Sequence, residues 1–289
     1  MTMKLIKTLL QTVTALLFIS VTLSLSAEES TPKDEGAPGV ADQLMLKTGS
    51  EEILSLYRPV QSSRSDGGVI LLHDRGTQPD WPGVIQTLRR GLPRYGWSTL
   101  AIKLPALEAG VQTSPQVLKQ WSESVPVAID AAIMVLEARN ISNIVLIGHG
   151  SGALVAADYM TKKPHEKIRG LIAVGMDGSK VADESLDGAL LLRRLDKVIF
   201  DIYGSRDLQS VVRSAIRRAT MATTAEPGKT PQHIRAAAIA RNFNSESALQ
   251  ISYRQHRIEG ADHQFRGYEK QLLNRVVGWL RRYAGIVSK

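Results

Sequence analysis

Short apolar runs alternate with amphipathic stretches along most of the chain. Gly68–Leu72 (GVILL) and Ile144–Ile147 (IVLI) are continuously apolar, as expected of strands that are buried on both faces of a sheet. In Pro126–Ala138 the apolar residues recur at helical spacing instead. This alternation predicts an α/β fold with a mainly parallel twisted sheet and helices on both of its faces.

The same patterns place the remaining elements. Further strands are expected at Ile53–Val60, Ser98–Leu104, Leu171–Gly175, Val198–Tyr203 and Ile251–Ile258, and further helices at Val84–Tyr95, Ala153–Lys162 and Tyr268–Tyr283. Residues 209–249 are expected to form a helical insertion before the last strand, and they carry six Lys and Arg against two Glu. We expect a small basic cap over or beside the site; a solvated helical decoration is the alternative.

The N-terminus has the features of a secretory signal peptide, residues 1–27. Lys4 and Lys7 precede an apolar stretch from Leu9 to Leu25, and small residues offer a cleavage site near Ala27. An uncleaved anchor is the alternative, because the stretch is long for a signal. Residues 28–43 are polar and predict a flexible leader, so the folded domain is expected at 44–289. These features predict an exported, periplasmic protein of a Gram-negative bacterium.

Composition removes several classes of function. The chain has no cysteine, which excludes disulfides, thiolate catalysis and thiolate metal sites. Its net charge of +8 falls to +6 if Lys4 and Lys7 leave with the signal. That modest excess suits an anionic envelope ligand or contact with a membrane surface, although it equally describes a merely soluble basic protein. No nucleic-acid or cofactor motif is present, and the oligomeric state is left open.

A glycine-rich pentapeptide follows the apolar run Ile144–Ile147. Its sequence is Gly148-His149-Gly150-Ser151-Gly152, which is close to the G-x-S-x-G turn that carries the nucleophile of α/β hydrolases. The central position is Gly150, which has no side chain and so no nucleophile. Ser151 is one residue late and is expected in the first helical turn, where its hydroxyl satisfies a free backbone N–H. A displaced nucleophile at Ser151 is the alternative.

Two later motifs supply a candidate acid and a candidate base. Gly204-Ser205-Arg206-Asp207 follows the strand Val198–Tyr203, and Gly260-Ala261-Asp262-His263-Gln264-Phe265 follows the last strand. An Asp that accepts from the ring N–H of a His fixes its tautomer and supports its charged form. Asp207 and His263 are therefore the candidate pair, with Asp177 as a second position for the acid. A remnant Asp–His hydrogen bond without function is the alternative.

The loop His73-Asp74-Arg75-Gly76 follows the strand Gly68–Leu72. It is similar to the loop that supplies an oxyanion-hole N–H, with Asp74 and Arg75 in place of small residues. We expect this loop, with His149 and Gly150, to line a binding site. A surface ion pair is the simpler interpretation of Asp74 and Arg75. Asp74, Asp262, His73 and His263 do not give four ligands at fitting spacing, so no metal is expected.

Together these motifs resemble the α/β-hydrolase superfamily over about residues 50–285. Within it, the chain resembles an uncharacterised envelope family of Gram-negative bacteria with a G-H-G-[ST]-G elbow. The resemblance implies the hydrolase fold but no substrate, and Gly150 departs from the serine-hydrolase pattern. The first hypothesis is a non-catalytic binding or scaffolding protein of the envelope. The second is an atypical ester or acyl hydrolase that uses Ser151, or a water activated by Asp207 and His263.

Overall fold

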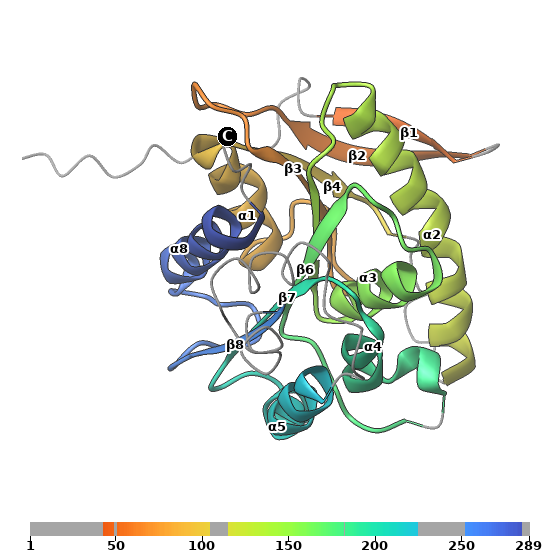
Figure 1. The fold of residues 1–289 in the computed structure, drawn as a ribbon, viewed down its shortest axis with the longest axis vertical. Helices are drawn as coiled ribbons and strands as arrows, with labels where there is room; N and C mark the ends of the chain where they lie inside the picture. The colour runs from red at the N-terminus through yellow and green to blue at the C-terminus, as the bar shows by residue number, and fades with distance from the viewer. Residues whose placement is uncertain (1–42, 49–50, 105–114, 182, 225–251, 285–289) are drawn as a thin grey trace, which may run out of the picture. The chain divides into compact units, whose positions relative to one another are not determined.

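The strands of the protein form one mainly parallel sheet. The computed structural model describes residues 43–48, 51–104, 115–181, 183–224 and 252–284. Strands β3 to β8 run parallel, and β2 and β1 add an antiparallel edge, in the order β1-β2-β4-β3-β5-β6-β7-β8 (Figure 1). The bounds are β1 Gln43–Thr48, β2 Glu51–Arg58, β3 Gly67–Leu72, β4 Trp97–Ile102, β5 Ile144–His149, β6 Ile168–Val174, β7 Val198–Gly204 and β8 Tyr253–Ile258. The predicted α/β fold is confirmed.

Helices cover both faces of the sheet, and the central strands β3 and β5 are buried at every position. Ile70 and Leu72 pack into one core with α2 (Pro115–Glu137), α3 (Ser151–Lys162) and α4 (Gly188–Arg194). Val69 and Leu71, which point to the opposite face, pack into a second core with α1 (Val84–Gly91) and α8 (Glu269–Trp279). Successive side chains of a strand alternate between faces, so the run GVILL supplies both layers.

Some element boundaries differ from those expected. The strand β1 was not predicted; it lies at the edge of the sheet and pairs with β2. Pro126 suits the start of a helix, but it lies inside α2, which begins at Pro115. The helix expected to reach Tyr95 ends at Gly91 and continues as a 3-10 turn, Leu92–Tyr95. In the predicted insertion, α5 (Gln209–Thr223) is helical.

Other predictions fall on parts of the chain that the structure does not describe. These are the signal peptide 1–27, nearly all of the leader 28–43, and the insertion from residue 225 to 249. All the residues that the structure describes belong to one compact unit. Within the described ranges, no helix is long and apolar enough to cross a membrane.

The topology brings four loops together at the carboxyl ends of the parallel strands. The strands β3, β5, β7 and β8 are parallel and lie in one half of the sheet, so their carboxyl ends lie on the same side of the molecule. The loops that follow them carry Asp74, Gly150, Asp207 and His263. In open α/β sheets ligands bind at the carboxyl ends of the strands.

Candidate functional site

Gly150 is the apex of a sharp turn between β5 and α3. Its backbone angles are φ 53° and ψ −118°, a combination that L-residues rarely adopt. The turn leaves no room beside it, because a Cβ on Gly148 would lie 2.3 Å from the Ala153 backbone and a Cβ on Gly152 would lie 2.3 Å from the Leu72 carbonyl oxygen. The backbone thus has the form of a nucleophile elbow, and glycine is at its tip.

Gly152→Ala should destabilise the protein by about 3 kcal/mol, because the added methyl group would collide with the β3 backbone, which cannot move aside. Urea unfolding measures the loss. Gly278→Ala is the control: a Cβ there meets nothing within 4 Å and Gly278 lies within helix α8, so alanine should be neutral or stabilise by up to about 1 kcal/mol. Equal effects at the two positions would contradict the close approach at the elbow.

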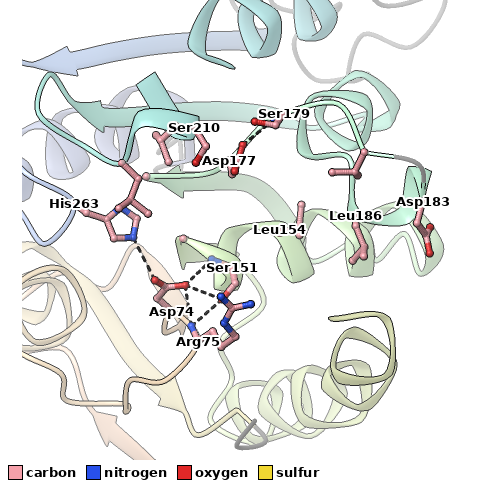
Figure 2. A pocket seen from close by; sticks show the side chains of 15 residues that line it. Asp74, Arg75, Ser151, Leu154, Asp177, Ser179, Asp183, Leu186, Ser210 and His263 are labelled. Atoms are coloured by element: carbon pink, nitrogen blue, oxygen red, sulfur yellow. Dashed lines mark hydrogen bonds and ion pairs between the residues drawn. The ribbon is translucent and has the colours of Figure 1, made fainter. Parts of the chain in front are cut away.

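The Asp74 carboxylate occupies the space in front of Gly150. A Cβ on Gly150 would lie 2.4 Å from Asp74 Oδ1. This oxygen accepts hydrogen bonds from the backbone N–H of Ser151 and from that of Arg75, each at 2.8 Å, and from the Ser151 hydroxyl at 2.7 Å (Figure 2). Those two N–H groups are the pair that forms an oxyanion hole in this fold. Asp74 therefore fills both the nucleophile's place and the oxyanion hole.

His263 lies between two carboxylates. Its Nδ1 is 2.5 Å from Asp207 Oδ1, and its Nε2 is 3.2 Å from Asp74 Oδ2. The structure thus brings Asp207 and His263 together and adds Asp74 on the other side of the ring. Asp177, the second candidate for the acid, instead accepts from the Ser179 N–H at 2.8 Å.

The two carboxylates keep His263 charged near neutral pH. Burial lowers the pKa of His263, but the hydrogen bonds and charges of Asp207 and Asp74 outweigh burial and raise its pKa to about 9. Burial acts to raise the pKa of Asp74, yet its hydrogen bonds to His263 and Ser151 hold that pKa well below the ordinary value. The resting pair at neutral pH is an imidazolium and a carboxylate.

The Ser151 hydroxyl forms hydrogen bonds with the loop that carries Asp74. It donates to Asp74 Oδ1 at 2.7 Å and accepts from the Arg75 N–H at 2.8 Å. As expected, Ser151 stands in the first turn of α3 and its hydroxyl accepts from a backbone N–H, but that N–H belongs to Arg75 in the loop after β3. The Asp74 carboxylate stands between this hydroxyl and the His263 ring.

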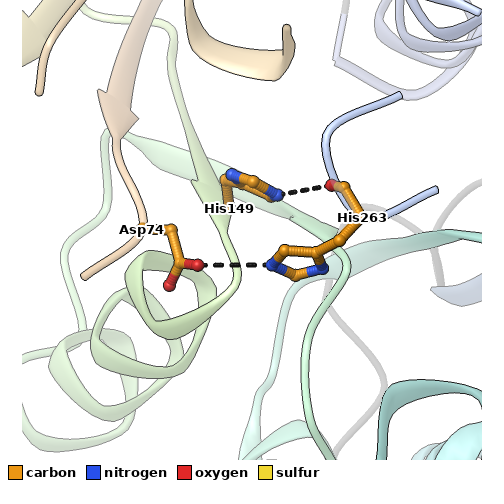
Figure 3. Close-up of side chains that lie close together, drawn as sticks. All are labelled: Asp74, His149 and His263. Atoms are coloured by element: carbon orange, nitrogen blue, oxygen red, sulfur yellow. Dashed lines mark hydrogen bonds and ion pairs between the residues drawn. The ribbon is translucent and has the colours of Figure 1, made fainter. Parts of the chain in front are cut away.

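His73 and His149 support the site from behind and do not line its pocket. His73 Nε2 accepts from the Leu104 N–H at 3.0 Å, so its Nδ1–H donates to the Asp74 carbonyl oxygen at 2.8 Å. The His149 ring packs against the His263 ring at a tilt of 32°, with 4.5 Å between centroids, and its Nε2 donates to the His263 carbonyl oxygen at 2.9 Å (Figure 3). Burial lowers the pKa of both, that of His149 to about 4, which suits these neutral roles.

The predicted binding set is corrected accordingly. His73 and His149 are 3% and 1% exposed, and both are occupied by the backbone contacts above. Gly76 is not among the pocket residues either; its φ of 73° lets the loop turn beyond Arg75. Asp74, Arg75 and Gly150 do line the pocket, together with Ser151 and His263. Sequence reasoning did not predict that the Asp74 carboxylate would lie at the elbow. The available signal was a charged residue at a loop position that is normally occupied by a small one.

The pocket has a volume of about 430 Å³. Its floor is the Asp74–His263 pair, and its walls come from α3, α5 and the segments that follow β6 (Figure 2). The apolar lining residues are Leu154, Val181, Leu186, Leu208 and Val211, and the remaining polar ones are Asp177, Ser179, Asp183 and Ser210. Such a mixture of apolar walls and a few convergent polar groups is typical of a small-molecule site.

Asp74, His149 and His263 could each offer one ligand atom to a metal, and these atoms lie within 4.8 Å of one another. Structural and catalytic zinc sites need three or four ligands with free lone pairs. Here Asp74 Oδ1 already accepts three hydrogen bonds, and Asp74 Oδ2 pairs with His263 Nε2. These contacts account for the cluster as a hydrogen-bonded unit.

Comparison of the sequence with protein families gives one match, to a protein of unknown function (DUF3530), over residues 26–120 and 108–233. The chain belongs to this family. A comparison with curated proteins finds no match. Membership in DUF3530 is consistent with the resemblance expected from the motifs, and it assigns no activity.

Solved structures of several α/β hydrolases share the fold. An esterase of Pyrococcus furiosus has a TM-score of 0.60 at 15% identity, with 84% of this chain and 92% of the esterase covered. Dienelactone hydrolase from Anabaena variabilis has a TM-score of 0.57 at 15% identity, over 84% and 97% of the two chains. Est1E from Butyrivibrio proteoclasticus has a TM-score of 0.55 at 12% identity, over 84% and 98%. The chain is thus a DUF3530 protein with the α/β-hydrolase fold.

Proposed function

We propose that this DUF3530 protein binds a small, largely apolar molecule in the pocket above Asp74 and His263, and that it does not cleave acyl esters through a serine. The observation that carries the proposal is the Asp74 carboxylate at the elbow. It accepts hydrogen bonds from both oxyanion-hole N–H groups and occupies the space into which a side chain on residue 150 would project. A substrate carbonyl oxygen would find this hole already filled.

The resting protonation state argues against the two hydrolase alternatives. A general base must be unprotonated, whereas the raised pKa of about 9 leaves His263 largely protonated at neutral pH. The Ser151 hydroxyl donates its hydrogen bond to Asp74 Oδ1 and not to the imidazole. Neither Ser151 nor a water is therefore activated by His263 in this arrangement.

The charges around the pocket favour a neutral ligand over an anion. Asp74, Asp177 and Asp183 line it, against Arg75 and the charged His263. An anionic ligand would also have to displace Asp74 from its three donors. We therefore replace the expected anionic envelope ligand by a neutral one. The exported, periplasmic location remains part of the proposal and is supported by residues 1–27 of the sequence alone.

Binding is tested with 1-hexanol, hexanoate and hexylamine, followed by NMR of the Leu154 and Val211 methyl groups. Hexanol should shift both with a Kd in the millimolar range, about −4 kcal/mol for so few atoms, and hexanoate should bind at least about tenfold more weakly. Leu154→Trp fills the pocket and removes the Leu154 methyl groups, so it should abolish the shift of Val211. Met134→Trp, on the exposed face of α2 (68% exposed), should leave both shifts. Hexanol shifts that persist in Leu154→Trp would place binding elsewhere.

A further inference from the structure

Asp74 has the attributes of a nucleophile that has moved to another loop. Its Oδ1 is fixed by three donors, whereas Oδ2 contacts His263 Nε2 at 3.2 Å. The side chain is 20% exposed and lines the pocket. The His263 ring faces this carboxylate (Figures 2 and 3). Asp207, on the other side of the ring, completes a pair that would otherwise serve a residue at position 150. A carboxylate needs no base to become nucleophilic, since it is already an anion.

We propose that Asp74 attacks a saturated carbon of an alkyl compound whose leaving group departs as an anion, such as a halide. This proposal rests on the ligand pocket proposed above. In the first step Asp74 Oδ2 forms a bond to that carbon, and the carbon–halogen bond breaks. Its electron pair leaves with the halide. The product is an alkyl ester of Asp74, and no proton is transferred in this step.

The second step returns the carboxylate. Esterification removes the negative charge that Asp74 holds beside His263, so the imidazolium releases its proton to solvent. Neutral His263 then takes a proton from a water that attacks Asp74 Cγ, and Asp207 holds the ring. The ester's C–O bond breaks, and the alcohol leaves with a proton. The sum is alkyl halide plus water giving alcohol, halide and one proton.

The position of Oδ1 selects this chemistry over cleavage of acyl esters. Displacement at a saturated carbon creates no oxyanion on the substrate, so a filled oxyanion hole does no harm. The hole is needed only in the second step, when negative charge develops on Oδ1 itself, between the Ser151 and Arg75 N–H groups. With an acyl ester, the adduct of Asp74 would expel the carboxylate, which is a weaker base than the alkoxide, and revert.

The experiment treats the full chain with 1-bromohexane in the presence of EDTA. Wild type should release bromide and 1-hexanol. His263→Gln should lower bromide release about 100-fold or more and accumulate one hexyl group on the peptide that contains Asp74. A single turnover in ¹⁸O-water should place the label in Asp74 and leave the first hexanol unlabelled. This pattern arises only when water attacks the carboxyl carbon.

Asp74→Asn should form no adduct, although its amide oxygen can still accept from Ser151 and Arg75. Glu259→Gln, an acid-to-amide change at a 76% exposed side chain, should behave like wild type. If hexanol binds in the pocket but His263→Gln gains no hexyl group on Asp74, or gains it on another residue, the nucleophile is refuted and the binding pocket stands. If hexanol does not bind, the pocket itself is refuted.

Discussion

A serine introduced at position 150 should create esterase activity only when Asp74 is removed as well. In Gly150→Ser the new Cβ would lie 2.4 Å from Asp74 Oδ1, and the oxyanion hole would stay filled. Asp74→Ala empties the hole but supplies no nucleophile. The double variant has both, and without Asp74 the pKa of His263 falls, so the ring can act as a base.

The expected gain is strongly non-additive. At about pH 8, hydrolysis of p-nitrophenyl butyrate by the double variant should exceed that by wild type or either single variant by on the order of 10²-fold. A fluorophosphonate should label residue 150 in the double variant and no residue of wild type. Asp74→Ala with Gly150→Ala is the matched control, since it differs by one hydroxyl group. A folded double variant no faster than this control would show that the elbow cannot present a nucleophile.

Stability should decline on the alkaline side of neutrality. The pKa of His263 is raised to about 9 in the folded protein from 6.5 in the unfolded chain. Its ion pairs therefore contribute fully below pH 6.5, and the contribution is lost as the pH rises through 9. A shift of this size contributes on the order of 3 kcal/mol to the free energy of unfolding.

Urea unfolding of wild type and His263→Gln between about pH 6 and 10 measures this contribution as the difference between the two curves. The difference should shrink with rising pH. Asp74→Asn should move the decline to lower pH, because it removes one of the two carboxylates beside the ring, and NMR titration of His263 should show the same lowering of the pKa. A wild-type His263 that titrates near 6.5 would refute the charged pair.

The fold was readable because its signals are local. GVILL and IVLI are apolar at every position, as expected of strands that are covered on both faces, and they form most of β3 and β5. Edge strand β1 was missed because its alternation is short and its burial is partial. The start of α2 was misplaced because proline at a helix start and proline within a helix look alike in sequence.

The elbow, the acid and the base were also determined by the sequence, since G-x-G-x-G after a strand fixes a backbone shape, and the order of the motifs fixes the parallel strand ends on which they stand. What filled the elbow was decided only by the tertiary structure. Asp74 lies 76 residues before Gly150 in the chain. Its charge in a normally small loop marks it as unusual, but no local pattern shows that its carboxylate reaches the N–H of Ser151. Such a contact depends on β3 and β5 being neighbours in the sheet, and on an oxyanion hole whose donors attract whichever acceptor the fold brings within reach.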